Sequence, residues 1–211
     1  MTDGIIFDLD GTLVDTRADL ALAVNLTRAE LGLPTLPEAQ VVAYVGEGML
    51  SLLTRALPEA PHLLEQALPV YQRQYSAHLL DHACLYPGVA SALARFNRLG
   101  LPLMVVTNKH RAFTDPILEG LGLSRFMATV VGGGDCHGLK PDPAPLVLAL
   151  ERAGCAAAGS WMVGDHFTDL EAGRRAGLQR CFCRYGFGDP HGETWELAVD
   201  DLNELAARLG A

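Results

Sequence analysis

The sequence has little positive charge. Its 211 residues carry 16 Lys and Arg against 25 Asp and Glu, which gives a formal net charge of −9, and its only lysines are Lys109 and Lys140. A nucleic-acid or anionic-membrane partner would require a basic face, so we expect neither kind of partner. An anionic substrate would therefore have to be bound by a local arrangement of cations and hydrogen-bond donors.

Long apolar runs and paired cysteines are also missing, and we expect no leader sequence. No apolar run approaches the roughly 18 residues of a membrane span, and the N-terminus lacks the basic start and the cleavage site of a signal peptide. The cysteines are scattered and odd in number, which is typical of reduced thiols. They are Cys84, Cys136, Cys155, Cys181 and Cys183. We therefore expect a cytoplasmic protein. Cys181 and Cys183 could form half of a zinc site, but no second Cys pair or His pair completes it.

Five short, mostly apolar segments predict buried strands. They are residues 5–8, 103–107, 128–132, 161–165 and 181–184. Helical stretches separate the later ones, at Ala90–Leu99, Pro143–Ala153 and Thr168–Ala176, and Asp115-Pro116 predicts the first turn of another helix. This alternation predicts the α/β class, with a doubly wound parallel sheet that binds ligands at the carboxyl ends of its strands.

The stretch from Thr16 to Asp81 breaks this alternation. It has no convincing strand, and its apolar residues recur at helical spacing. Examples are Leu20, Val24, Thr27 and Leu31, then Leu50, Leu53 and Leu57. We predict a small helical domain at 16–81, inserted after the first strand into a core formed by residues 1–15 and 82–211. The sequence contains no internal repeat, and it does not specify an oligomeric state.

Acids and donors follow four of the predicted strands. They are Asp8 and Asp10, then Thr107 and Asn108, then Lys140, and finally Asp165 and Asp169. Each group alone has a simpler interpretation: a turn at the first pair, a loop cap at the second, a solvated lysine, and an N-cap at the last pair. Their occurrence in order, each after a strand, favours one shared site.

The chemistry of such a site follows from charge. Gathered carboxylates repel one another unless a cation neutralises them, and oxygen ligands select a hard ion, so we expect Mg²⁺. Lys140, Thr107 and Asn108 suit a phosphate dianion. Asp8 is ionised at neutral pH and could attack phosphorus, while Asp10 could protonate the leaving alcohol and later activate water.

The residues Asp8-x-Asp10-x-Thr12, Thr107, Lys140 and Gly164-Asp165-x-x-x-Asp169 resemble, in order, the four motifs of the haloacid dehalogenase superfamily. The resemblance implies a Rossmann-like core, and it implies that the insert 16–81 is a helical cap. It also implies roles for the site residues. Asp8 would be nucleophile and metal ligand, Asp10 the acid/base with its backbone carbonyl on Mg²⁺, and Asp165 a further ligand. Asp169 would support the metal, and Thr107 and Lys140 would hold the phosphoryl group.

Residues 45–48, 55–57, 86–89 and 106–109 are similar to bacterial phosphoglycolate phosphatases, which implies 2-phosphoglycolate as the substrate. The turn Gly46-Glu47-Gly48 is a candidate specificity element, or a plain interhelical turn. The chain departs from that pattern at His166, where Ser is common, and at 135–138. The presence of Asp10 argues against a dehalogenase, and a cap without lysine argues against a Schiff-base enzyme. A phosphatase of sugar phosphates (including a muropeptide-recycling one) or nucleotides, a phosphomutase and a non-catalytic binding protein remain as alternatives.

Overall fold

A six-stranded parallel sheet forms the centre of the molecule. The computed structural model describes residues 2–210, and the strands lie in the order β5-β4-β1-β6-β7-β8, every neighbouring pair parallel. Their bounds are β1 Gly4–Phe7, β4 Leu103–His110, β5 Met127–Gly133, β6 Ser160–Gly164, β7 Gln179–Cys183 and β8 Leu197–Val199. The predicted α/β class with a Rossmann-like sheet is confirmed.

The first strand lies in the middle of this sheet. Ile5 pairs with Leu103 of β4 on one side and with Trp161 of β6 on the other, and all four residues of β1 are buried. A strand covered on both faces is apolar throughout, as this Gly-Ile-Ile-Phe run is. The next residue, Asp8, therefore emerges near the middle of the carboxyl edge of the sheet.

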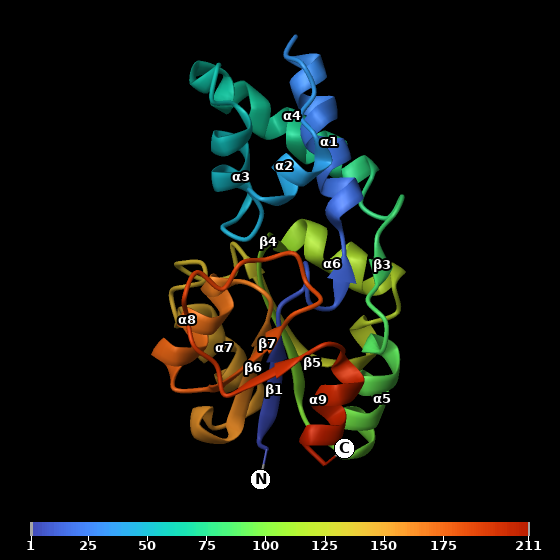
Figure 1. Cartoon of the computed structure of the whole chain (residues 1–211), viewed down its shortest axis with the longest axis vertical. Coiled ribbons are helices and arrows are strands. Elements are labelled where there is room, and N and C mark those ends of the chain that lie inside the picture. Colours follow the sequence, from blue (N-terminus) through green and yellow to red (C-terminus); the bar gives the residue numbers. More distant parts are fainter. Residues whose placement is uncertain (1, 211) are drawn as a thin grey trace.

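Helices cover both faces of the sheet (Figure 1). Ile5 and Phe7 face one layer of helices and Ile6 faces the other, as the alternation of side chains along a strand requires. The first layer contains α5 Val89–Arg98, α6 Arg111–Gly120 and α9 Leu202–Arg208, and the second contains α7 Ala144–Ala153 and α8 Phe167–Ala176. Short 3-10 turns occur at η2 Ser124–Phe126 and η3 Ala157–Gly159.

The remaining helices gather beyond the carboxyl edge of the sheet, at the top of Figure 1. They are α1 Arg17–Glu30, α2 Glu38–Val42, α3 Met49–Ala56, η1 Pro61–Leu63 and α4 Leu64–Ala77. The chain enters and leaves this helical segment through a short antiparallel pair, β2 Val14–Asp15 and β3 Cys84–Leu85. Within residues 2–210, no helix is both long and apolar enough to cross a membrane.

One local prediction was wrong. Helix α6 begins at Arg111 rather than near Asp115-Pro116, because the ring of His110 caps it by accepting a hydrogen bond from Ala112 N at 3.3 Å. Leu50, one of the apolar residues at helical spacing, lies in α3 as expected but is 58% exposed. The reason is that α3 is short, and Leu52, Leu53 and Ala56 form its buried face.

Candidate active site

The predicted site residues meet at the carboxyl edge of the sheet. Asp8 directly follows β1, Asp165 directly follows β6, and Asp169 lies in the first turn of α8. Thr107 lies in the last part of β4, and Lys140 lies between β5 and α7. Neighbouring parallel strands end at one edge, and this brings together residues that are far apart in the sequence.

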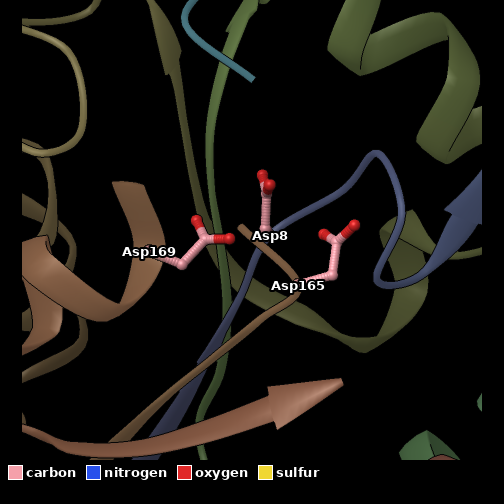
Figure 2. A group of neighbouring side chains, drawn as sticks. All are labelled: Asp8, Asp165 and Asp169. Carbon is pink, nitrogen blue, oxygen red and sulfur yellow. The ribbon is translucent and has the colours of Figure 1, made fainter. Parts of the chain in front are cut away.

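Three carboxylates converge there (Figure 2). One oxygen from each of Asp8, Asp165 and Asp169 lies within 4.8 Å of the others, and all three residues are buried. Asp8 Oδ1 is buried without a hydrogen-bond partner. Burial, together with the charges of Asp169 and Asp8, raises the pKa of Asp165 well above its usual range. Uncompensated buried charge of this kind is unfavourable, so the three carboxylates fit a divalent cation, and their oxygen donors suit a hard one.

Asp165 is held in place by two loops. Its Oδ1 accepts a hydrogen bond from Thr12 Oγ1 at 3.1 Å, and its Oδ2 accepts from the backbone N–H groups of Phe187 and Gly188 at 3.0 and 2.8 Å. Gly11 has φ +80°, and a Cβ there would lie 2.1 Å from Asp165 Oδ2, so only glycine fits. Sequence analysis missed the second loop. The glycines of Gly186-Phe187-Gly188 were a signal that the backbone of this loop closely approaches another group, which is the Asp165 carboxylate.

Lys140 neutralises two members of the cluster. Its Nζ lies 2.7 Å from Asp169 Oδ1 and 2.9 Å from Asp8 Oδ1, and it donates a hydrogen bond to Val106 O at 2.6 Å. The contact with Asp8 is an ion pair without hydrogen-bond alignment, which is why the Asp8 oxygen still lacks a donor. Burial alone would lower the pKa of Lys140, but Asp169 and Asp8 raise it more, so the ammonium group stays charged.

The side chain of Asn108 bridges three parts of the chain. Its Nδ2 donates to the carbonyl oxygens of Gly46 and Lys140, both at 2.8 Å, and its Oδ1 accepts from Lys140 N at 2.8 Å. Both amide N–H donors are therefore used. A phosphoryl group at this position would have to contact the backbone of Asn108, because the side chain has no donor left for it.

Asp10 contacts a different set of groups. Its Oδ1 accepts a hydrogen bond from Thr16 Oγ1 at 2.6 Å, and its Oδ2 lies 3.1 Å from Lys109 Nζ. Its side chain is not one of the three carboxylates that converge. Thr107 is buried nearby, and its Oγ1 accepts from Lys109 N at 3.2 Å. Lys109 had no role in the sequence analysis, although it is one of only two lysines.

A cleft with an empty volume of about 620 Å³ lies between the helical segment and the carboxyl edge of the sheet, and both line it. Gly46 and Gly48 line the cleft, whereas Glu47 does not, and its carboxylate forms an ion pair with Arg55. Gly46 has φ +120°, and a Cβ there would lie 2.7 Å from Cε1 of His166. Burial lowers the pKa of His166 to about 4. The turn 46–48 therefore contacts the core at His166, which is the residue that replaces the common Ser of the phosphoglycolate phosphatase pattern.

Comparison with known proteins identifies the class. The family model of the haloacid dehalogenase-like hydrolases matches residues 5–183. This span runs from the second residue of β1 to the end of β7 and includes every predicted site residue. The chain belongs to the haloacid dehalogenase-like hydrolase family. The resemblance inferred from the motifs is confirmed.

Individual relatives carry a more specific name. The chain is 37% identical over 207 residues to a phosphoglycolate phosphatase of Chromobacterium violaceum, covering 95% of this chain and 93% of that protein. It is 33% identical over 234 residues to the phosphoglycolate phosphatase of Escherichia coli K12, covering 98% and 92%. A crystal structure of a predicted phosphoglycolate phosphatase from Haemophilus somnus 129PT superposes with a TM-score of 0.90 at 28% identity, covering 100% of this chain and 98% of that one.

Proposed function

We propose that this protein is a phosphoric monoester hydrolase that hydrolyses 2-phosphoglycolate through an aspartyl-phosphate intermediate. The observation that carries this proposal is the buried cluster of Asp8, Asp165 and Asp169 with the Lys140 ammonium group against it. The names of relatives that align over almost the whole chain support the substrate.

The reaction uses the residues in two steps. Asp8 attacks phosphorus, and the bond from phosphorus to the ester oxygen breaks while Asp10 gives that oxygen a proton. Asp10 then takes a proton from a water molecule, which attacks phosphorus, releases phosphate and restores the Asp8 carboxylate. Thr107, the backbone of Asn108 and Lys140 hold the phosphoryl oxygens in both steps.

The metal that we propose is Mg²⁺, held by the Asp8 and Asp165 carboxylates and by the backbone carbonyl of Asp10. Asp169 supports the site, because one of its oxygens is paired with Lys140 and the other accepts a hydrogen bond from His166 N at 3.1 Å. When bound, the ion would offset the repulsion between an anionic nucleophile and an anionic substrate.

The helical segment 16–81 is proposed as a cap domain over a core of residues 1–15 and 82–211. Its position beyond the carboxyl edge of the sheet supports this division (Figure 1). Closure of such a cap would exclude bulk water from the cleft during the first step. We also propose that the protein acts in the cytoplasm.

A panel of phosphate esters, assayed with Mg²⁺ and with EDTA, tests the proposed function. The panel contains 2-phosphoglycolate, sugar phosphates (including one from muropeptide recycling), nucleotides and a hexose phosphate assayed for phosphomutase activity. We expect Mg²⁺-dependent phosphate release, with kcat/KM for 2-phosphoglycolate at least ~10-fold above the others, which is about 1.4 kcal/mol. No release from any ester would refute the enzymatic assignment, and a preferred sugar phosphate or nucleotide would refute the substrate.

The nucleophile is tested by Asp8→Asn. An amide cannot displace the ester oxygen as a carboxylate does, so we expect Mg²⁺-dependent phosphate release to disappear. Asp81→Asn is the matched control, because Asp81 is exposed and forms an ion pair with His78 on the surface. We expect the control to keep its rate within about twofold, and turnover by Asp8→Asn would contradict the role of Asp8.

A further inference from the structure

The cleft has very little positive charge for the end of the substrate that is not phosphate. Its wall on the side of the helical segment is largely apolar, with Leu20, Leu52, Tyr71 and Tyr75 among the lining side chains. Within residues 2–210, the lining includes one Lys or Arg, which is Lys109. A substrate whose leaving group is anionic would have to find its counter-charge there.

Lys109 is buried where the helical segment meets the carboxyl edge of the sheet. Its side chain is 4% exposed, and Nζ lies 3.1 Å from Asp10 Oδ2 in the core. From the helical segment, the hydroxyl of Tyr75 accepts a hydrogen bond from Nζ, and the Tyr75 ring centroid lies 4.5 Å from it. An ammonium group has three N–H donors. At most two of them are engaged, by the hydrogen bond to Tyr75 and the ion pair with Asp10, so at least one remains for a group bound in the cleft.

We infer that Lys109 determines substrate specificity by binding a carboxylate on the leaving group. This inference rests on the proposed function. A general acid lies about 2.6–3.2 Å from the ester oxygen that it protonates, and Lys109 Nζ is 3.1 Å from the carboxylate assigned to that task. A carboxylate joined to the ester oxygen through one carbon atom therefore falls within ion-pair reach of Nζ. The aromatic wall excludes water and strengthens the ion pair.

Other charged groups near the cleft are already committed. The ammonium group of Lys140 is paired with Asp8 and Asp169 at the phosphoryl end. Arg55 forms an ion pair with Glu47 and does not line the cleft. Arg55 is therefore the matched control, since it is a cation beside the cleft for which we expect no role in recognising the carboxylate.

Two unreactive phosphonates isolate this contact from catalysis. 3-Phosphonopropionate replaces the ester oxygen of 2-phosphoglycolate with a methylene group, and propylphosphonate lacks the carboxylate. We expect Lys109→Met to raise the inhibition constant of the first at least ~10-fold relative to the second, or about 1.4 kcal/mol. Lys109→Arg should keep most of the preference. Arg55→Met should leave the ratio within about twofold of that of the unmodified protein.

The same ratio of inhibition constants is measured for Lys109→Gln, so that the test still gives a result if Lys109→Met fails to fold. A role limited to holding Asp10 or packing the cleft would weaken both phosphonates alike and leave their ratio intact. An unchanged ratio in both variants, or a ratio lost in Arg55→Met, would overturn the inference. An unmodified protein that hydrolyses no ester refutes the proposed function itself, which is a distinguishable outcome.

Discussion

Replacing Lys140 with Met should destabilise the fold as well as the site. The Lys140 side chain is 1% exposed and that of Asp169 is not exposed at all, with 2.7 Å between Nζ and Oδ1. The substitution leaves the buried carboxylates of Asp8 and Asp169 without their counter-ion and Val106 O without its donor. Removing one partner of a buried ion pair costs about 3–5 kcal/mol.

That cost translates into a measurable change in melting temperature. For a chain of this length, each kcal/mol lowers Tm by about 2–4 °C, so Lys140→Met should melt roughly 6–20 °C below the unmodified protein. Calorimetry in EDTA measures this without a contribution from bound metal. Arg208→Met provides the matched control. Its ion pair with Glu204 is on the surface, where such pairs are worth about 1 kcal/mol or less.

The double variant Lys140→Met/Asp169→Asn tests the assigned cause. The amide that replaces the Asp169 carboxylate would carry no charge, and its oxygen could still accept the hydrogen bond from His166 N that Asp169 now accepts. If the penalty comes from an uncompensated carboxylate, the double variant should recover at least about 2 kcal/mol of the loss. A single variant within about 1 kcal/mol of the unmodified protein, or a double variant as unstable as the single one, would refute this reasoning.

Two further predictions concern the cap turn and the cysteines. Gly46→Ala should lower kcat/KM at least ~10-fold, because the added Cβ would meet His166. The control is Gly32→Ala, where φ is +75° and the space around the residue is open, so we expect only a loss of stability of about 1 kcal/mol. Equal kcat/KM values for the two variants in a kinetic assay would contradict this prediction. Burial raises the pKa of Cys181 to about 12, so at pH 8 iodoacetamide should label exposed Cys84 at least ~100-fold faster, as followed by mass spectrometry. Fast labelling of Cys181 would show that β7 is less protected than described.

Much of the site was predictable because a parallel sheet converts sequence order into spatial proximity. An apolar run such as 5–7 has to be a buried strand, and the residue after it has to emerge at the carboxyl edge. The positions of Asp8 and Asp165 follow from that rule alone. Lys140 follows less directly, since its loop has no periodicity, and its contacts with Asp8 and Asp169 depend on how that loop folds back.

Most of the contacts that were missed depend on tertiary packing. Asn108 has the donors that a phosphate needs, but the sequence does not show that Gly46 O and Lys140 O use both of them. The start of α6 was misplaced because Asp115-Pro116 has a strong local signal, whereas a histidine cap at His110 has a weak one. For α6, local propensity predicted that a helix is present, and the contact at His110 decided where it begins.

The insertion point gives the helical segment a direct connection to the proposed acid/base. Thr16, just before α1, donates its hydroxyl to Asp10 Oδ1, and Tyr75 of α4 accepts from the Lys109 ammonium group that is paired with Asp10 Oδ2. Both oxygens of this carboxylate are thus bound to groups that the segment itself carries or contacts. If the segment moves as the lid that we propose, these contacts change with it. Opening would then release the groups that orient the Asp10 carboxylate, so closure would couple its orientation to the exclusion of water from the cleft.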